Sequence, residues 1–493
     1  MPTTTSLFNT IVKYGAGTQM TDLEFIKREI DKWRNSDKRK LQVAGDNYYS
    51  GEHDILKRQR TIIGKDGVIQ VVENLPNNKI IDNQYAKLVE QKANYLLGKP
   101  ITIDTPNARY ALALKDVFNK RFARTLKNLG RDSLNGGIGW LHPHYNERGE
   151  LCFKRFDSHE ILPFWADSDH TILDCAVRLY SVEGYDGTTE KKIEKVEIYS
   201  ANGVQRYVLS QNGLIPDVEN PSSAYMTVTD SDGKQTDYNW DSKIPLIAFK
   251  YNAKEIPLIK KVKSLQDGIN TILSDFENNM QEDARNTILV IHNYDGQDLS
   301  EFRYNLAAYG AVKVKTVDGS AGKVETLQVA VNAENYKAIL ELFKKALIEN
   351  AMGYDAKDDR LSGNPNQMNI QSMYSDIDLD ANGMETEFQA SFEELLWFIN
   401  THLSNAGQGN YATEEVNIIF NRDILINETE SITNCKASVG IISNETIIGQ
   451  HPWIDDVEQE QERLKKEKQQ LMEEYSEYKE AFGADGDNHA AEE

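Results

Sequence analysis

The sequence predicts an α+β fold in which long helices and a β-rich region follow one another along the chain. Apolar residues recur every three or four positions between Ile259 and Arg285, and this spacing keeps them on one face of a helix. Between Glu147 and Tyr251 the chain instead has runs rich in Val, Ile and Tyr, separated by Asn-Gly and Asp-Gly pairs typical of hairpin turns. With 493 residues, the chain is long enough for roughly two to four domains.

The composition is that of a soluble globular protein, with 40% hydrophobic and 27% charged residues. It contains no run of roughly 18 apolar residues, so no membrane partner is expected. The cysteines, Cys152, Cys175 and Cys435, fit no metal-ligand spacing, and we expect free thiols, no metal and no cofactor. The net charge of −22 argues against tight binding of nucleic acid, because proteins that grip phosphate present a basic surface. It is compatible with a protein past which DNA moves without adhering.

The N-terminal part is predicted to contain several amphipathic helices. Thr21 and Glu24 have the spacing of a capping box, so a helix is expected to begin there. Asn78–Thr102 predicts a second helix, which Gly98 helps to stop, and Phe118–Asn135 predicts a third.

The centre of the chain is predicted to be two long helices with a small module between them. The first helix covers about Ile259–Arg285, the compact module Asn286–Val331 follows, and the second helix begins near Asn332. A polar loop, Asp355–Gln367, then precedes a third long helix, about Met368–Leu403. We interpret this order as a stalk with a tip at one end and a loop at the other.

The C-terminal part continues the mixed pattern. Val416–Phe420 predicts a strand, Glu428–Val439 a helix, and Ser443 is the expected N-cap of a further short helix. The last helix, about Asp455–Ala481, is mostly charged, and we expect a solvated outer helix in an oligomer. Its thin apolar line, with members seven residues apart, consists of Val457, Leu464, Leu471 and Tyr478. The acidic tail Gly483–Glu493 lacks Lys and Arg and is expected to be disordered.

One acidic cluster suggests chemistry. Its carboxylates have nearly the spacing of a calcium loop, but the position that such a loop needs as glycine is Ala381. The segment also continues a helical apolar stripe, which favours an acidic helix face. The alternative is a metal-dependent hydrolase that uses the cluster together with His53 or His159. The cluster consists of Asp376, Asp378 and Asp380.

Six stretches of the chain carry a resemblance to a known family. They are Tyr48–Ile55, Asn78–Thr102, Ser264–Glu282, Leu289–Val312, Val416–Asn427 and Val439–Glu462. In this order they resemble the portal (head–tail connector) proteins of tailed bacteriophages, in particular those of long-tailed phages of Gram-positive hosts. Together they span nearly the whole chain.

The resemblance implies a portal fold with a β-rich wing, long stem helices, a small α/β clip, a tunnel loop and helix, and a helical crown. The implied parts are the N-terminal helices and wing 1–255, stem helices 256–285 and 332–353, clip 286–331, tunnel loop 354–367, tunnel helix 368–403, wing strand return 404–426, crown 427–482 and tail 483–493.

The resemblance also implies a function without catalytic residues or enzymatic activity. About twelve subunits would form a ring at the portal vertex of the virion capsid, assembled in the host cytoplasm, through which double-stranded DNA is packaged and ejected. The implied partners are the terminase large subunit, a head-completion or tail adaptor protein, the scaffold and the major capsid protein. The other alternative is a non-portal head assembly protein.

In this interpretation the tunnel loop is the DNA-contacting site. Twelve copies would carry a net charge of about −260 (12 × −22), which repels phosphate from the channel wall. Basic rings at Lys357 and Arg360 would then centre the duplex through its backbone. Alternatively, both only offset the neighbouring aspartates. The remaining predicted loop residues are Asn364, Asn366 and Gln367.

The clip is the predicted partner-binding site. Tyr and Arg are residue types that suit a protein interface, and four of them occur in this module. Packing between subunits is the alternative role. The four residues are Tyr294, Arg303, Tyr304 and Tyr309.

Overall fold

The computed structural model divides the chain into two compact units. The first consists of Met1–Gly353 and Ile377–Asp423, and the second of Tyr354–Asp376 and Ile424–Glu493. The structure describes residues 21–63, 68–73, 75–186, 188–211, 213–229, 232–241, 243–283, 288–292, 301, 313–317, 319, 322–327, 333–356, 367–422, 428–454 and 457–482.

The β-rich part of the first unit is a six-stranded antiparallel sheet with the order β10-β9-β8-β7-β6, in which β11 also pairs with β9. Gly203 forms the turn between β8 and β9 with a φ of 111°, and Ser200 pairs with it, so the predicted Asn-Gly hairpin is confirmed. The strands are β6 (Ile161–Trp165), β7 (Leu173–Asp186), β8 (Thr189–Ser200), β9 (Gly203–Ser210), β10 (Gly213–Pro216) and β11 (Ser222–Ser223).

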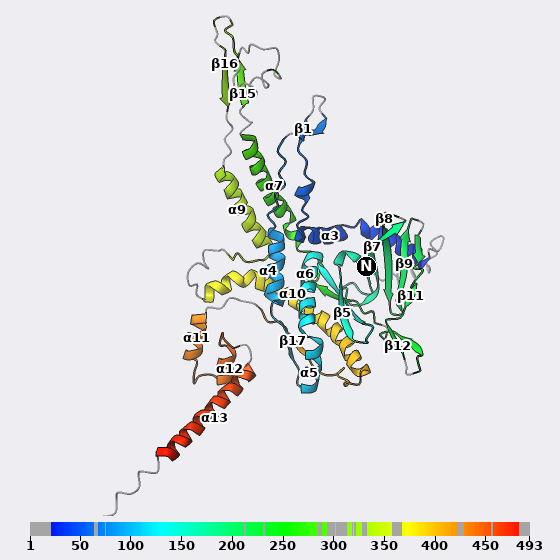
Figure 1. Ribbon diagram of the computed structural model, residues 1–493, viewed down its shortest axis with the longest axis vertical. Helices are drawn as coiled ribbons and strands as arrows, with labels where there is room; N and C mark the ends of the chain where they lie inside the picture. The colour runs from blue at the N-terminus through cyan, green and yellow to red at the C-terminus, as the bar shows by residue number, and fades with distance from the viewer. Residues whose placement is uncertain are drawn as a thin grey trace, which may run out of the picture. The chain divides into compact units, whose positions relative to one another are not determined.

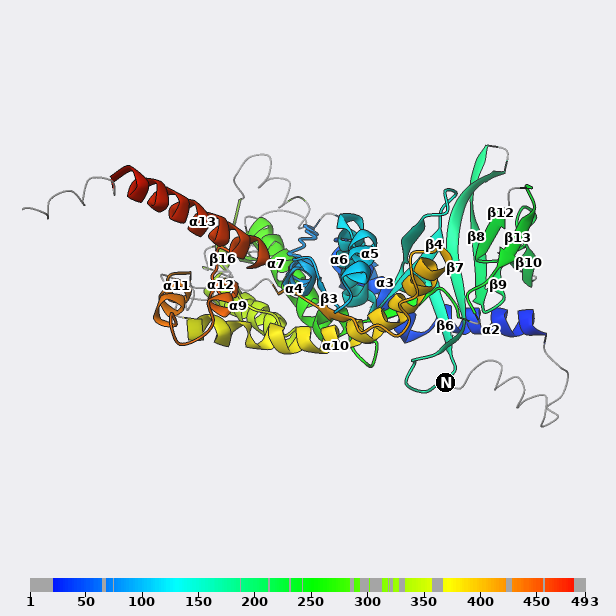
Figure 2. The same cartoon turned by 90° about the horizontal axis from the view of Figure 1, so that it is seen from below.

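Successive strand residues point to opposite sides of this sheet. Each side is packed against another part of the first unit. On one face, helix α2 (Asp22–Arg34) packs Ile30 and Trp33 against β7 and β8, and Figure 2 shows the helix along that side of the strands. Thr21 and Glu24 form the predicted capping box at the start of α2.

A second, three-stranded sheet covers the other face. Its order is β14-β4-β5, with β4 at Ile138–Tyr145, β5 at Leu151–Phe156 and β14 at Ile247–Lys250. Trp140 of β4 stacks on Trp165 of β6, with 5.9 Å between the ring centroids. The buried core between the sheets comprises Ile138, Trp140, Phe156, Ile161, Trp165, Ala176, Tyr199, Val204, Ile244 and Leu246.

Helices surround the three-stranded sheet and connect it to the centre of the chain. The long helix α10 (Gln367–Asn405) places Phe388 and Phe392 on Phe249 of β14, at centroid distances of 5.1 and 5.7 Å. The other helices are α3 (Asp37–Tyr49), α4 (Gln84–Leu97), α5 (Ala108–Val117) and α6 (Lys120–Gly136), with the 3-10 turns η1 (Asp54–Lys57) and η2 (Ser158–Glu160).

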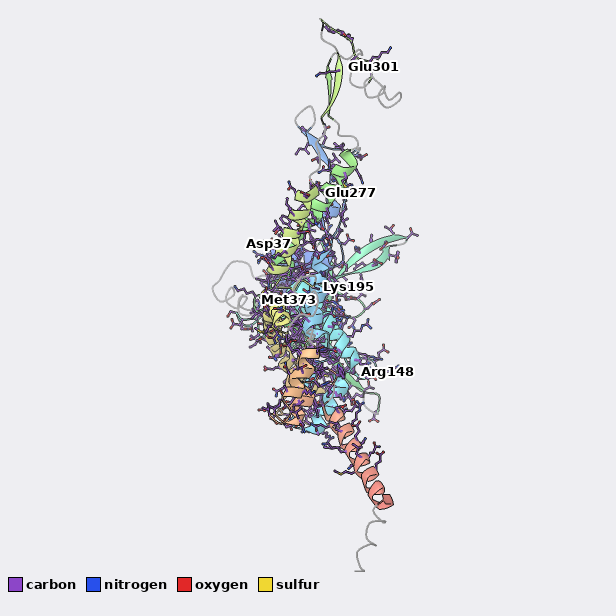
Figure 3. The ribbon with its side chains drawn as sticks, turned by 90° about the vertical axis from the view of Figure 1, so that its left-hand side faces the viewer. Asp37, Arg148, Lys195, Glu277, Glu301 and Met373 are labelled. Atoms are coloured by element: carbon purple, nitrogen blue, oxygen red, sulfur yellow. The ribbon has the colours of Figure 1, made fainter. Side chains whose placement is uncertain are left out.

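The predicted stalk is an antiparallel pair, α7 (Ile259–Asp283) and α9 (Ala333–Asn350), seen side by side in Figure 1. Phe276 and Asn279 of α7 contact Tyr336 near the start of α9. Beyond the helices, β15 (Ile288–His292) pairs antiparallel with β16 (Lys323–Leu327). Glu277 lies on the half of α7 that is nearer to these strands (Figure 3).

Three smaller strand pairs complete the first unit. They are β1 (Thr61–Ile63) with β2 (Ile69–Val71), β12 (Met226–Thr229) with β13 (Gln235–Tyr238), and β3 (Thr102–Asp104) with β17 (Asn417–Ile419). The last pair joins segments more than 300 residues apart and confirms the predicted strand at Val416–Phe420. Within the described ranges, none of the helices combines the length and apolar content that crossing a bilayer requires.

The second unit is helical. It contains α11 (Glu428–Ala437), α12 (Asn444–Gly449) and α13 (Val457–Phe482), and Ser443 caps α12 as predicted. Leu471 of α13 is 64% exposed, as expected for a solvated helix. The acidic tail 483–493 lies outside the described residues.

One sequence prediction is wrong in detail. The helix predicted from Asn78 begins only at Gln84, because the backbone of residues 78–82 hydrogen-bonds to α7 side chains. The predicted apolar faces of the stalk are only partly covered: Met280 is 55% and Ile339 44% exposed, whereas Leu347 is fully buried. The contacts of the first unit therefore cover α9 mainly near Leu347.

Candidate functional site: the braced helix pair

One face of α7 is a row of buried polar side chains at four-residue spacing. Gln266, Asn270, Ser274 and Asn278 are each 0% exposed. A helix rises about 6.0 Å over four residues, close to the ~6.6 Å over which alternate N–H groups recur along an extended chain. The row can therefore hydrogen-bond to an extended segment, with one side chain for every second backbone amide.

Residues 78–85 are that segment. The N–H groups of Asn78, Ile80 and Asp82 donate to Asn278 Oδ1 (2.7 Å), Ser274 Oγ (2.9 Å) and Asn270 Oδ1 (3.0 Å). The row ends at Gln266, whose Oε1 accepts from the Tyr85 N–H (3.0 Å) at the start of α4 and whose Nε2 donates to the Asp82 carbonyl (2.8 Å). We call this set of contacts the polar ladder. The polar ladder joins α7 to the extended segment that leads into α4. This segment pairs with none of the described strands.

The ladder continues into His53. Asn270 Nδ2 donates to His53 Nδ1 (2.8 Å), and His53 Nε2 donates to the Tyr48 carbonyl (3.0 Å). Both ring nitrogens are thus used in the neutral form. Burial lowers the pKa of His53, which is 1% exposed, and keeps it neutral. His53 is a structural residue of the ladder.

An ionic cluster lies next to the ladder on α7. Lys263 Nζ contacts Asp54 Oδ2 (2.6 Å) and Asp267 Oδ2 (2.8 Å), and the Tyr48 hydroxyl donates to Asp267. The hydrogen bond from Lys263 lowers the pKa of Asp54 to about 2, although burial opposes the shift. These contacts fix the 3-10 turn at Asp54 to α7.

The base of the helix pair, where α7 begins and α9 ends, is held by Asp380 of α10. Lys92 Nζ of α4 binds Asp380 Oδ2 (2.7 Å) and also donates to the carbonyl of Met352 (3.0 Å), where α9 ends. The Tyr251 hydroxyl donates to the same carboxylate (2.8 Å). The Lys92 side chain is 3% and that of Asp380 10% exposed, so the ion pair is almost buried. Removing one partner of such a pair leaves an uncompensated buried charge.

Two carboxylates of the hydrolase interpretation, Asp378 and Asp380, are bound by cations and hydroxyls, and the third, Asp376, is exposed. Asp378 accepts from the Tyr95 hydroxyl (3.0 Å) and pairs with Arg422, which also binds Glu385 (2.6 Å). His159 pairs with Asp46 (2.9 Å); burial lowers its pKa, but the Asp46 carboxylate outweighs burial and raises it. Among the described residues, no group of three or more His, Cys, Asp or Glu side chains could hold a metal ion. The arrangement serves ion pairing between elements.

The predicted tunnel-loop and clip residues are mostly beyond what the structure describes. Gln367 is the first residue of α10, and its N–H donates to Glu430 Oε2 (2.9 Å) within the second unit. A carboxylate at a helix N-terminus is favourable because it meets the positive end of the helix dipole. The residues outside the described ranges are Lys357, Arg360, Asn364 and Asn366 of the loop, and Tyr294, Arg303, Tyr304 and Tyr309 of the clip.

Sequence reasoning missed the polar ladder. The signal was present, because Gln266, Asn270, Ser274 and Asn278 repeat every four residues beside the apolar stripe. Such a repeat normally indicates a solvated helix face. Its burial becomes visible only once an extended segment lies against it.

Two long helices braced by a polar ladder and a buried ion pair define a rigid structural framework. A family model described as "Phage portal protein, SPP1 Gp6-like" matches residues 29–474, so the chain belongs to this family of phage portal proteins. The α+β portal fold predicted from the sequence is thereby confirmed.

Two relatives share most of their length with this chain. A portal protein of Bacillus phage SPP1 is 27% identical over 437 residues, which cover 87% of this chain and 84% of that protein. A portal protein of Clostridium phage phiCD119 is 28% identical over 434 residues, covering 86% of this chain and 91% of that protein.

Proposed function

We propose that the chain assembles into a ring of about twelve subunits whose central channel passes double-stranded DNA into the phage head and out again. The observation that supports this most is the braced helix pair. Because α7 is fixed along its length and α9 at its base, the pair can carry the β15–β16 module as a rigid stem. Membership of the portal family supports the same function.

The parts of the chain take different roles in this proposal. α7 and α9 form the stem, and residues 286–331 form the clip, which docks the terminase large subunit and later a head-completion or tail adaptor protein. The clip residues Tyr294, Arg303, Tyr304 and Tyr309 supply the anchoring contacts. The six-stranded sheet belongs to the wing and residues 427–482 to the crown, with the scaffold and the major capsid protein as further partners.

The channel wall is formed by the loop 354–367. Its residues Lys357 and Arg360 provide basic rings that centre the duplex, with Asn364, Asn366 and Gln367 as polar neighbours. The large negative charge of the assembly keeps phosphate from adhering elsewhere along the channel. The chain carries no catalytic residue in this proposal, and ATP hydrolysis belongs to the packaging motor.

Negative-stain electron microscopy of the purified protein tests the proposal. We expect rings with a central hole, and a double variant Lys357→Ala, Arg360→Ala should keep the ring but impair DNA packaging. A compact monomer, or a closed particle without a channel, would contradict the proposal. A closed particle would instead favour a non-portal head assembly protein.

A further inference from the structure

Helix α6 is strongly basic within an acidic chain. Residues 117–131 contain Lys120, Arg121, Arg124, Lys127 and Arg131 and no Asp or Glu, whereas the whole chain has a net charge of −22. A basic stretch of this kind is the electrostatic footprint expected at a site for a polyanion.

Four of these cations lie along one face of the helix. Lys120, Arg124, Lys127 and Arg131 follow one another at intervals of four, three and four residues, which aligns them on α6. Eleven residue steps correspond to about 17 Å of helix. Duplex DNA carries about ten phosphate charges over that length.

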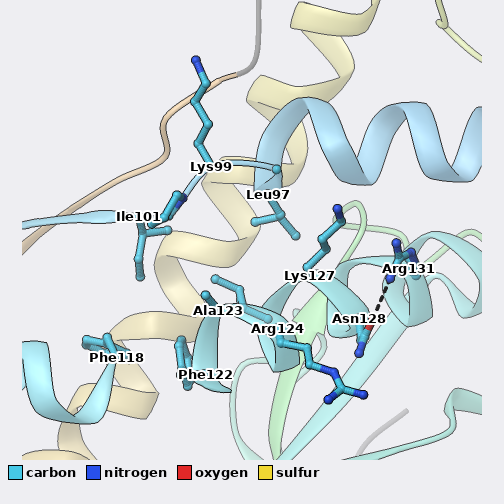
Figure 4. A pocket seen from close by; sticks show the side chains of 13 residues that line it. Leu97, Lys99, Ile101, Phe118, Phe122, Ala123, Arg124, Lys127, Asn128 and Arg131 are labelled. Carbon is cyan, nitrogen blue, oxygen red and sulfur yellow. Dashed lines mark hydrogen bonds between the residues drawn. The ribbon is translucent and has the colours of Figure 1, made fainter. Parts of the chain in front are cut away.

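A groove of about 440 Å³ lies between the C-terminal end of α4 and this face of α6 (Figure 4). Its lining includes Lys99, Arg124, Lys127 and Arg131 and, within the described chain, no carboxylate. Figure 4 shows Lys99 on one side and Arg124, Lys127 and Arg131 on the other. We call this groove, together with Lys120 at the N-terminal end of the same face of α6, the α6 groove.

The cations of α6 differ in how they are compensated. Arg131 Nε binds Glu90 Oε1 (2.7 Å), and this carboxylate lies close enough to Lys127 to feel its charge. By contrast, Lys120, Arg121 and Arg124 are exposed and form no ion pair with any described residue. Lys120 and Arg124 therefore give this face of α6 positive charge that the rest of the described chain does not neutralise.

The groove suits phosphate better than an apolar protein segment. Three apolar residues of its lining, Leu97, Phe122 and Leu126, are at most 5% exposed, while the unpaired cations Lys120 and Arg124 are exposed to an incoming partner. The N-terminus of α6, capped by Asn119, adds the positive end of its helix dipole to the same surface.

We propose that the α6 groove binds the phosphodiester backbone of double-stranded DNA, at a site separate from the loop 354–367. This inference rests on the proposed function, which makes duplex DNA the polyanion that the assembly handles. Binding through phosphates carries no sequence preference and depends strongly on salt.

The test compares the full-length wild-type protein with the triple variant Lys120→Gln, Arg124→Gln, Lys127→Gln. Binding of a short fluorescent DNA duplex is measured by anisotropy between about 0.05 and 0.2 M salt. We expect the affinity of the variant to fall at least about tenfold, and the slope of log K against log salt to decrease by up to about 2.7, since each phosphate contact contributes about 0.9.

A matched control removes the same charge elsewhere. Arg28, Arg148 and Lys192 are exposed and unpaired among the described residues, and Arg28→Gln, Arg148→Gln, Lys192→Gln should change the affinity by no more than about twofold. Equal losses in the two triple variants would overturn the proposal. So would wild-type protein that forms rings but binds no duplex, and in that case the proposed function would stand.

One further outcome assigns the groove to a different partner. If the α6 triple variant binds DNA normally but no longer forms rings, the groove contacts an acidic surface of a neighbouring copy, and the DNA proposal is wrong. Ring formation is therefore recorded by electron microscopy for every variant.

Discussion

Asn270 of α7 connects three parts of the first unit through one amide. Its Oδ1 accepts from the Asp82 N–H and from Gln266 Nε2, and its Nδ2 donates to His53. The side chain is fully buried, so water cannot replace these partners. Each hydrogen bond is modest alone, but an unpaired buried group costs its full desolvation.

Replacing Asn270→Ala should therefore lower the free energy of unfolding by about 1–3 kcal/mol, because the Asp82 N–H and His53 Nδ1 lose their partners. The measurement is urea unfolding followed by circular dichroism. Gln281→Ala, on the exposed surface of the same helix, serves as the control and should stay within about 0.5 kcal/mol of wild type. A loss of similar size in both variants would contradict the role of the ladder.

Glu394 of α10 is a half-buried carboxyl without a described hydrogen-bond donor. Burial raises its pKa to about 7, and the positive charge of Lys243 only partly opposes the shift. The ordinary pKa of this carboxyl is 4.5. Between pH 4.5 and about pH 7, the folded state therefore keeps the carboxyl proton that the unfolded chain releases. Stability should thus decrease as pH rises through this window, since the folded state binds the extra proton.

The variant Glu394→Gln should be more stable than wild type at pH 8 by about 1–3 kcal/mol and no different at pH 4. The neutral amide avoids the buried charge at every pH. Thermal unfolding followed by tryptophan fluorescence from pH 4 to 8 measures the effect. Glu393→Gln changes an exposed neighbour and should leave the pH dependence as it is. A wild-type profile that is flat between pH 4.5 and 7 would refute the prediction.

At the scale of elements, the α7–α9 pair depends on a close approach at Gly268. A Cβ atom added there would lie 2.5 Å from Cε2 of Phe343 on α9. Real contacts of a Cβ are longer, so a larger residue would push Phe343 or the whole helix outward. The small residue and the aromatic ring thus fix the spacing between the helices.

Gly268→Ala should loosen the pair. Overpacking costs typically 1–3 kcal/mol, and about 1 kcal/mol is regained because Ala favours the helix. Hydrogen exchange should report faster exchange in α9, and adding Phe343→Leu should restore it. The control is Gly383→Ala in α10, where no described atom lies within 4 Å of the added Cβ. That variant should be stabilising, and a stabilising Gly268→Ala would contradict the close approach.

Elements also show where sequence prediction succeeds. The capping box at Thr21, the N-cap at Ser443 and the hairpin at Gly203 were predicted because their signals lie within a few residues. The start of α4 was misplaced because the backbone of residues 78–82 hydrogen-bonds to side chains of α7, about 190 residues away in the sequence. The functional roles assigned to the loop 354–367 and to the clip remain predictions.

At the scale of the whole molecule, charge is the dominant property. Each chain carries −22, and the proposed ring of about twelve subunits would concentrate this charge around one axis. Like charges oppose association unless salt screens them. The basic α6 groove is a local exception to this pattern, since it lies in a chain that is acidic overall.

Ring formation should therefore increase with salt. Raising the salt concentration from 0.1 to 1 M shortens the screening length from about 10 Å to about 3 Å, which weakens repulsion between subunits. Size-exclusion chromatography with light scattering measures the fraction of rings. If rings dissociate at high salt, ion pairs between subunits outweigh the net repulsion, and the prediction fails.

The sequence by itself determined the order of helices and strands, the α+β class and, through resemblance, the portal family. These follow from patterns of period two or near four and from short capping and turn signals. Only the tertiary structure decided that a polar row on α7 is buried, that Lys92 and Asp380 pair beneath α9, and that the cations of α6 border a groove. The first two depend on segments far apart in the chain meeting at hydrogen-bond distance, and the third depends on how α4 and α6 pack, so no local pattern encodes any of them.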